Sequence, residues 1–474
     1  MTESKPGHLP PKRSSREGGH APSSRGSAPS AARAVRRPAG FEPRAAAVRV
    51  VAEVVMQGRA LDDALDRAFS TPIYAGMEQR DRAFARLIVV TVLRRYGELD
   101  HVVRSFIDKP LPENQGLLWP LLLCGAAQLL CLDTPPHAAI SLAVEQARAD
   151  GGARRFDKLV NAVLRRVSVD GPARLAALDG ARLNTPDWFW HRWVATYGEE
   201  QARAIASANL TEAALDFSVK TDPDGWAGRL GGVVLPTGSV RVKSRGRIED
   251  YPGYNEGSWW VQDAAAALPG RLFGDVNGLA IADLCAAPGG KTAELVSAGA
   301  NVTAVELSAA RLSRLADNLS RLQLKAELVT ADVATWSPGR LFDGVLLDAP
   351  CTATGTIRRH PDILRLKRIA DVAQLSAIQA KLLDAASLLV RPGGLLVYCS
   401  CSLELEEGRD VIAKFLVNHT EFRREPVQAH EIGGLTEAIT HEGDLRTLPV
   451  QMRMADPEMS GLDGFYAARL RRSV

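Results

Sequence analysis

From Gly278 onward, short apolar segments alternate with amphipathic helical patterns, and this alternation constrains the fold more than any other feature of the chain. The apolar segments predict strands at 279–284, 302–305, 326–329, 343–348 and 394–399, with helices starting at Lys291 and spanning 309–322 and 372–390. Strands separated by helices pair in parallel, so we expect a doubly wound, mostly parallel α/β sheet. Ligands of such sheets bind at the carboxyl ends of the strands, near the point where the strand order reverses.

The part of the chain before this sheet divides into three segments. Residues 1–44 are rich in Ser, Pro, Gly, Ala and Arg, and we interpret them as a disordered basic tail, either a solubilising extension or an RNA tether. Residues 45–170 show helical periodicity with almost no strand signal, which predicts an all-helical domain. Residues 171–250 are interpreted as a connector with a small α+β subdomain, and residues 251–474 as the domain that contains the α/β sheet.

Composition limits where the protein works and what it binds. The 474 residues are 46% hydrophobic, yet no segment has the roughly 18 uninterrupted apolar residues of a membrane span. Six irregularly spaced cysteines without a cleavable signal indicate reduced thiols in the cytoplasm. The net charge is +3, but the first 47 residues carry nine Lys and Arg against three Glu, so the remainder is slightly acidic. Nucleic acid would therefore be bound through local basic patches.

The loop after the first strand of the sheet has the composition of a nucleotide-binding turn. It reads Cys285-Ala286-Ala287-Pro288-Gly289-Gly290-Lys291, and its small residues let a ligand approach the backbone at a helix N-terminus. Glu306 ends the next strand, where a carboxylate binds a ribose diol in nucleotide-binding α/β folds. The loop lacks both the three-glycine dinucleotide fingerprint and the Walker pattern. An adenosine with a short tail, as in S-adenosyl-L-methionine, suits it better than NAD or ATP.

Two thiols follow the ends of two later strands. Asp348-Ala349-Pro350-Cys351 closes one strand and Tyr398-Cys399-Ser400-Cys401 the next. Carbon 5 of a pyrimidine is a poor nucleophile, so its methylation requires a thiolate that adds to carbon 6, an acid near ring nitrogen 3, and a base that later removes the carbon 5 proton. Cys401, Asp348 and Cys351 offer these three functions. Free cysteines are more often core residues, and for Cys285 we prefer that packing role.

Two sets of motifs carry a family resemblance. Gln79–Phe84, Val92–Arg95, Leu132–Ala139 and Val160–Arg166 resemble the NusB-type helical RNA-binding domain. The strand-end motifs, together with Pro252–Gly257 and Asp463–Tyr466, resemble the RNA 5-methylcytosine methyltransferases of the RsmB/Sun (NOL1/NOP2/Sun) type. The resemblance implies an all-α NusB-like domain ahead of an α/β Rossmann-like class I methyltransferase domain, S-adenosyl-L-methionine as cofactor and 16S rRNA as substrate. We expect a monomer without a membrane partner. We also expect no metal, because Cys399 and Cys401 lack two further clustered metal ligands.

The resemblance also implies residue roles. The family nucleophile corresponds to Cys401, and Cys351 assists proton removal and release, with Lys291 and Asp348 completing the catalytic set. The implied cofactor contacts are Cys285, Ala286, Ala287, Pro288, Gly289, Gly290 and Lys291 at the methionine part, Glu306 supported by Arg311 at the ribose, Asp332 at the adenine, and Asp348 at the sulfonium end or the target base. RNA contacts are predicted for Arg165, Arg166, Arg358, Arg359 and His360.

Three alternatives stay open. DNA 5-methylcytosine enzymes use the Pro-Cys thiol as nucleophile, which would exchange the roles of Cys351 and Cys401. Cys399 is a second candidate nucleophile, because the family usually has a small residue without a thiol there. A binding or assembly factor that merely retains a cofactor domain is a different function, although a pure binder has no need of two thiols. Amino-group methylation is disfavoured, because such enzymes place an aromatic residue where Cys351 stands.

Overall fold

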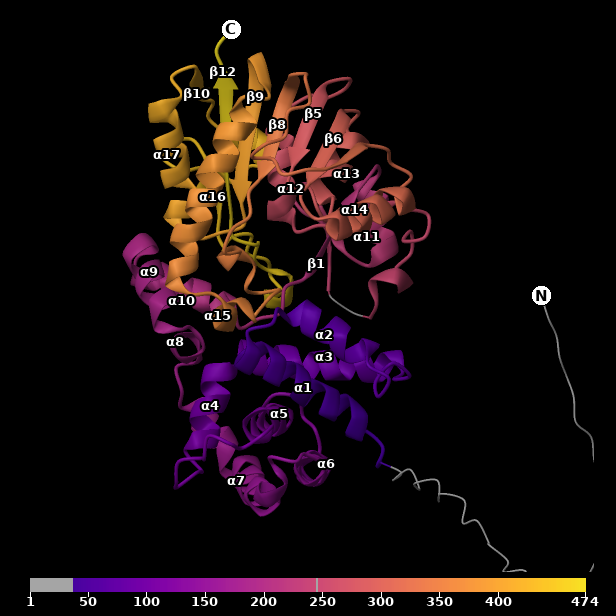
Figure 1. The fold of residues 1–474 in the computed structure, drawn as a ribbon, viewed down its shortest axis with the longest axis vertical. Helices are drawn as coiled ribbons and strands as arrows, with labels where there is room; N and C mark the ends of the chain where they lie inside the picture. Colours follow the sequence, from indigo (N-terminus) through magenta and orange to yellow (C-terminus); the bar gives the residue numbers. More distant parts are fainter. Residues whose placement is uncertain (1–36, 244–245) are drawn as a thin grey trace, which may run out of the picture. The chain divides into compact units, whose positions relative to one another are not determined.

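Helices α1 to α7 gather around one hydrophobic core, which explains the helical periodicity of this part of the chain (Figure 1). The computed structural model describes residues 37–243 and 246–474, of which Ala39–Val474 form one compact unit. The helices are α1 (Phe41–Gln57), α2 (Leu61–Ser70), α3 (Gln79–Arg94), α4 (Tyr96–Arg104), α5 (Leu118–Leu130), α6 (Pro136–Ala149) and α7 (Asp157–Ala176).

Both ends of this helical domain differ from the prediction. Residues 1–36 of the predicted tail (1–44) lie outside the described residues. Its last four residues, 41–44, belong to α1. Phe41 is buried there, and the Arg44 side chain donates a hydrogen bond to Gln128 at 2.6 Å. At the other end α7 continues past residue 170 and includes Pro172. A single buried aromatic residue thus anchors a helix within a stretch whose composition is typical of disorder.

The connector consists of helices, and the subdomain after it is a small antiparallel sheet. The helices are α8 (Gly180–Asn184), α9 (Asp187–Tyr197) and α10 (Glu199–Ala208), and the subdomain holds α11 (Pro223–Leu230), β1 (Leu215–Val219), β2 (Val233–Val234), β3 (Val240–Val242) and β4 (Trp259–Val261) in the order β2-β3-β1-β4. Strand β4 lies beyond the boundary predicted at residue 250. It belongs to this sheet because it pairs with β1, and the ring of Trp259 packs on Phe217 at 4.4 Å.

The catalytic domain is the doubly wound α/β sheet that the alternation predicts. Its strand order is β10-β12-β9-β8-β5-β6-β7, with β11 on β12, and β5 to β9 are parallel. The strands are β5 (Ala280–Leu284), β6 (Asn301–Glu306), β7 (Glu327–Thr330), β8 (Phe342–Asp348), β9 (Val390–Ser400), β10 (Phe422–Arg424), β11 (Leu445–Thr447) and β12 (Phe465–Arg472). The helices are α12 (Ala264–Arg271), α13 (Gly290–Ser297), α14 (Ala309–Arg321), α15 (Ile363–Leu366), α16 (Ile369–Ser387) and α17 (Arg409–Asn418). Strands β10 and β12 run antiparallel to their neighbours and were not predicted.

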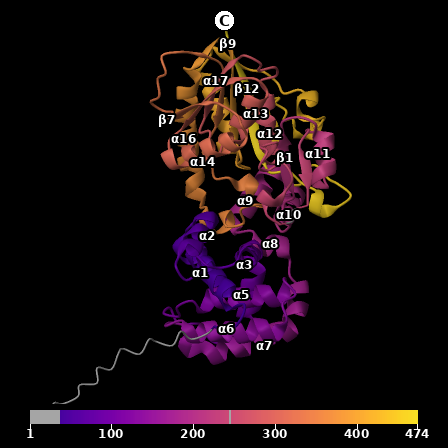
Figure 2. The same cartoon turned by 90° about the vertical axis from the view of Figure 1, so that its right-hand side faces the viewer.

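Alternate residues of the central strands supply two separate cores, one on each face of the sheet. Leu346 and Val397 pack with α12 on one face, whereas Leu347 and Tyr398 pack with α16 and α17 on the other (Figure 2). The strand period of two therefore places Cys399 on the α12 face, with Val397. None of the helices in the described part of the chain is long and apolar enough to span a membrane.

Candidate active site

The two predicted thiols meet where the neighbouring strands β8 and β9 end. Asp348 and Cys399 are register partners in this parallel pair, and the chain then turns out of the sheet through Cys351 on one side and Cys401 on the other. The two Sγ atoms lie 3.4 Å apart. The backbone N–H of Gly355 donates to the Cys401 carbonyl at 2.9 Å, which ties the two loops together. Residues 50 positions apart in sequence thus form one thiol pair.

The environments of the two thiols differ. The hydrogen bond with Cys401, and then burial, raise the pKa of Cys351 well above its ordinary value. Either sulfur can donate this hydrogen bond, and the raised pKa indicates that Cys351 keeps its proton at neutral pH. Of the two, Cys401 is the one that lines a cavity of about 770 Å³, which is also bounded by α16 and by the α1–α2 connection around Leu61.

Lys291 and Asp348 form an ion pair at the end of β8, three residues before Cys351. The Lys291 ammonium donates to Asp348 Oδ2 at 2.8 Å and lies 4.8 Å from the centre of the Phe465 ring. Burial acts to lower the pKa of Lys291, but the carboxylate of Asp348 outweighs it and the pKa is raised. Lys291 is therefore a buried cation, and the carboxylate that pairs with it also accepts the Cys399 thiol at 3.5 Å.

Cys399 is fully buried and turned away from the cavity. Its Sγ donates to Asp348 Oδ1 at 3.5 Å, and burial, followed by the charge of Asp348, raises its pKa well above the ordinary value. A buried thiol of this kind stays protonated, whereas a nucleophile must be an accessible thiolate. Its position therefore favours Cys401 over Cys399 as the nucleophile.

The loop between β5 and α13 leaves the sheet in a tight left-handed turn. Cys285 has a φ of 59° and Gly289 a φ of 101°, and the N–H of Gly289 donates to the Ala286 carbonyl at 2.8 Å. A Cβ at Gly289 would meet Leu315 Cγ at 2.8 Å, so glycine lets the loop lie close to α14. Gly290 then begins α13 and leaves its first backbone N–H groups facing the strand ends. Burial raises the pKa of Cys285 to about 12, in agreement with a packing role.

Glu306, at the end of β6, is held firmly beside this loop. Its carboxylate accepts hydrogen bonds from the N–H groups of Ala287 at 3.4 Å and Ser308 at 3.1 Å, and Arg311 pairs with it at 3.2 Å. Arg311 also donates to the Ala287 carbonyl at 2.8 Å. Asp332 is exposed just after β7, and its carboxylate accepts the Ala334 N–H at 2.9 Å. A rigid carboxylate beside backbone amides fits the ribose diol and the charged methionine end of S-adenosyl-L-methionine.

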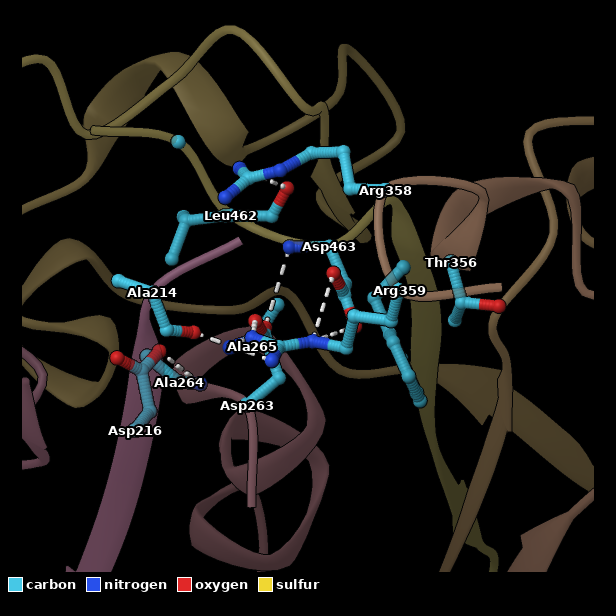
Figure 3. Close-up of polar contacts among 12 residues, drawn as sticks. Ala214, Asp216, Asp263, Ala264, Ala265, Thr356, Arg358, Arg359, Leu462 and Asp463 are labelled. Carbon is cyan, nitrogen blue, oxygen red and sulfur yellow. Dashed lines mark hydrogen bonds and ion pairs between the residues drawn. The ribbon is translucent and has the colours of Figure 1, made fainter. Parts of the chain in front are cut away.

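Two of the predicted RNA contacts, Arg358 and Arg359, point into the protein instead (Figure 3). Arg359 donates to Asp263 at 2.5 Å and to Asp463 at 3.1 Å, and both carboxylates are buried. Arg358 is 3% exposed and donates to the carbonyl of Leu462 at 3.3 Å. Burial leaves the Arg358 guanidinium no surface for RNA, although its Nε has no hydrogen-bond partner among the described residues. The Arg359 side chain is 21% exposed and lines the cavity that Cys401 also lines, so its contact with RNA stays a prediction.

The other predicted RNA contacts lie at the surface. Arg165 and Arg166 are exposed on α7, where the Arg166 guanidinium lies 5.0 Å from the centre of the Phe106 ring. The His360 side chain is partly exposed and lines the cavity that Cys401 also lines. All three are available to a ligand, and their contact with RNA stays a prediction.

Sequence reasoning assigned no role to three buried acids that organise the site. Asp263 and Asp463 bind Arg359 from segments far from it in the chain, and Glu407 accepts hydrogen bonds from both cysteine loops. The acidic run that ends at Glu407 follows Cys401 directly, and this proximity was the one signal available. Within residues 37–243 and 246–474, no group of His, Cys, Asp and Glu side chains gathers as a metal site would require.

Comparison with known proteins identifies both domains. The family model described as 16S rRNA methyltransferase RsmB/F matches residues 273–471, and the model of the NusB family matches residues 42–169. Ribosomal RNA small subunit methyltransferase B of Sodalis glossinidius is 35% identical over 398 residues, which cover 80% of this chain and 90% of that protein. The protein of the same name from Xylella fastidiosa is 35% identical and covers 92% of this chain and 99% of its own length.

Solved structures share the fold. The structure of PH0851 has a TM-score of 0.71 at 22% identity and covers 92% of this chain and all of its own. A methyltransferase homologue from Pyrococcus horikoshii has a TM-score of 0.50 at 25% identity, covering 62% of this chain and 97% of its own. The cofactor is S-adenosyl-L-methionine, which suits the loop before α13 and Glu306. With relatives of this identity and coverage, the chain belongs to the RsmB/F family of 16S rRNA methyltransferases.

Proposed function

We propose that the enzyme methylates carbon 5 of a cytosine in 16S rRNA through a covalent bond between Cys401 and carbon 6 of the base. The thiol pair at 3.4 Å beside the Lys291–Asp348 ion pair carries this proposal. Methylation of an amino nitrogen needs no protein nucleophile, because that nitrogen has its own lone pair. A pair of thiols, an acid and a cation together are what carbon 5 chemistry requires.

In the first step the thiolate of Cys401 adds to carbon 6, and the electron pair of the carbon 5–carbon 6 bond moves toward ring nitrogen 3. Lys291 passes a proton to the Asp348 carboxylate that it contacts, and the Asp348 carboxyl group donates it to that nitrogen, so no full negative charge develops on the ring. The hydrogen bond from Cys351 steadies the Cys401 sulfur before the attack. The base must leave its stack for both faces of the ring to become accessible.

The methyl group comes from S-adenosyl-L-methionine, which supplies it as an electrophile to the enamine carbon 5. Once Cys401 is bonded to carbon 6, Cys351 loses the hydrogen bond that is the largest cause of its raised pKa. Cys351 then releases its proton to solvent more readily and, as a thiolate, removes the proton from carbon 5. The electrons of the carbon 5–hydrogen bond restore the ring double bond, and the carbon 6–sulfur bond breaks with its electron pair on Cys401, which returns as a thiolate. Ring nitrogen 3 gives its proton back through Asp348 to Lys291.

Access distinguishes the two possible nucleophiles. Cys401 lines the cavity, whereas the high pKa of Cys351 favours its protonated, donating form. The arrangement of DNA enzymes, with the Pro-Cys thiol as nucleophile, would require the opposite. We therefore assign the attack to Cys401 and the proton removal to Cys351.

Denaturing gels of protein incubated with 16S rRNA and the cofactor test the assignment. We expect Cys351→Ala to accumulate a covalent RNA adduct, Cys401→Ala to form none, and the matched control Cys131→Ala, a free thiol of the helical domain, to turn over like the wild type. The reverse pattern for the first two variants would support the DNA-enzyme arrangement. If neither the wild type nor any variant crosslinks or transfers labelled methyl groups, the reading as a non-catalytic binding or assembly factor replaces the proposal.

We also propose that Arg165, Arg166 and His360 contact the rRNA. The two arginines are exposed on α7 and His360 borders the Cys401 cavity, so they are placed for phosphate and target-loop contacts respectively. Replacing one phosphate-binding arginine by Ala should lower the slope of log affinity against log salt by about 1. The slope should not change for Arg391→Ala, whose guanidinium pairs with Asp343 at 2.8 Å. Equal slopes for all variants would remove α7 from the interface.

A further inference from the structure

The carboxylate of Glu407 is fully buried between the two loops that carry the thiols. Its Oε1 accepts the backbone N–H of Thr352 at 2.9 Å and the Gln379 amide at 3.1 Å. Its Oε2 accepts the hydroxyl groups of Ser402, at 2.6 Å, and of Thr352. Glu407 therefore uses both oxygens, each with two donors.

These donors are the immediate neighbours of the thiols. Thr352 follows Cys351, and Ser402 follows Cys401, so the Glu407 carboxylate bridges the two cysteine loops, whose Thr352 and Ser402 hydroxyl groups also lie 3.2 Å apart. The bridge is anchored on the sheet, because the backbone carbonyl of Glu407 accepts the Tyr398 hydroxyl at 2.8 Å from β9. Among the hydrogen bonds of the described residues, Glu407 is the only charged side chain that binds both Thr352 and Ser402.

From this geometry we propose that Glu407 is a positioning residue for the methyl transfer, whose carboxylate fixes the distance and register of Cys351 and Cys401. The inference rests on the proposed two-thiol reaction. One sulfur must reach carbon 6 while the other reaches the proton on adjacent carbon 5, so their spacing has to match neighbouring ring atoms. Burying a carboxylate is costly unless donors surround it, and an apolar side chain would fill the same space but could not bridge the two loops.

Two conservative substitutions separate geometry from charge. Glu407→Gln keeps the length of the side chain, and its amide oxygen can accept both N–H donors. The two hydroxyl groups can rotate to accept from the new amide NH2, so the bridge survives. Glu407→Asp keeps the charge but withdraws it by about 1.5 Å, the length of one carbon–carbon bond, so the bridge must break on one side.

Steady-state methylation of 16S rRNA by the full-length chain is the first readout. Because a misplacement of 1 Å can cost about 100-fold in rate, we expect Glu407→Asp to lose on the order of 100-fold in kcat, with the KM for RNA and for S-adenosyl-L-methionine unchanged. Glu407→Gln should keep most of the wild-type kcat. Glu406→Asp is the matched control: that side chain is 41% exposed and pairs with Arg192, so it should turn over like the wild type.

Thiol spacing itself is the second readout, and it does not depend on activity. Diamide removes two electrons and two protons from neighbouring thiols, and the Cys351–Cys401 disulfide can be counted by peptide mass spectrometry. We expect a high yield in the wild type and in Glu407→Gln and a low yield in Glu407→Asp. An Asp variant with wild-type kcat and disulfide yield, or Gln and Asp variants that lose activity equally, would overturn the inference. A wild type that forms the disulfide but never methylates would instead refute the proposed function.

Discussion

Replacing Arg359 by Met should lower the free energy of unfolding of the protein rather than its affinity for RNA. Arg359 pairs with two carboxylates, Asp263 at 2.5 Å and Asp463 at 3.1 Å, whose side chains are 4% and 5% exposed (Figure 3). Removing one partner of a buried ion pair leaves an uncompensated charge, which costs about 3–5 kcal/mol. Met has a similar length and fills the space, so we expect this loss to come mainly from the two orphaned carboxylates.

The size of the loss should depend on pH in a known direction. Burial raises the pKa of Asp463 to about 7, and Arg359 is the largest influence that opposes it. Burial is also the largest influence on Asp263, but the charge and hydrogen bond of Arg359, together with Arg241 and the Ala265 N–H, outweigh it and the pKa is lowered. Without Arg359 both folded-state pKa values rise above the unfolded ones. The folded variant then binds more protons than the unfolded chain, so its stability should fall as the pH rises from 5.5 to 8.

Urea unfolding at these two pH values measures the effect. Arg391→Met is the matched control, because Arg391 is 55% exposed and its pair with Asp343 should contribute at most about 1 kcal/mol. The salt dependence of 16S rRNA binding, measured where both variants are folded, should be the same for Arg359→Met and the wild type. An Arg359 variant as stable as the wild type, but with a smaller salt slope, would refute this reasoning and return Arg359 to the RNA interface.

Three further perturbations test the site. Added to Cys351→Ala, the change Cys399→Ala should leave the covalent RNA adduct on denaturing gels, because the Cys399 thiol is buried against Asp348, and loss of the adduct in the double variant would make Cys399 the nucleophile. Gly355→Ala should cost about 1–3 kcal/mol in urea unfolding, since its Cβ would lie 1.9 Å from the Gly464 carbonyl oxygen, and an unchanged midpoint would contradict that contact. Asp283 has a pKa raised to about 7 by burial, so the folded protein binds the extra proton and this group makes stability fall as the pH rises from about 4 to 7. Asp283→Asn should remove that part of the fall in thermal melts from pH 5 to 8, and an unaltered pH profile would show that Asp283 does not titrate there.

The parallel strands could be predicted because each is a short apolar run bounded by polar residues. The observed β5 and β8 begin and end within one residue of the prediction. Strand β12 escaped notice because Arg469 and Arg471 lie within its sequence. These arginines are compatible with a strand only because the fold supplies partners: Arg469 donates to Glu431 at 2.5 Å and Arg471 to Glu425 at 3.0 Å.

The meeting of the two thiols could also be predicted from the sequence, whereas the partners of Arg359 could not. Adjacent parallel strands end at the same edge of a sheet, so residues just beyond them must converge. Asp263 and Asp463 lie 96 and 104 positions from Arg359, on segments whose approach depends on the small subdomain and the C-terminal strand. A cation in a polar loop is typical of an RNA contact until the acids that neutralise it are known.

The segment after Cys351 is where the helical domain meets the catalytic machinery. Arg94 of α3 donates to the Arg358 carbonyl at 3.0 Å, and the N–H of Leu61 at the start of α2 donates to Asp362 at 3.0 Å. The same segment begins at Thr352, which Glu407 holds against the Cys401 loop. A helical domain that served only to capture RNA would need a tether to the sheet, not hydrogen bonds to the loop that carries Cys351. The fold therefore couples the NusB-like domain to the position of Cys351 through one short stretch of chain.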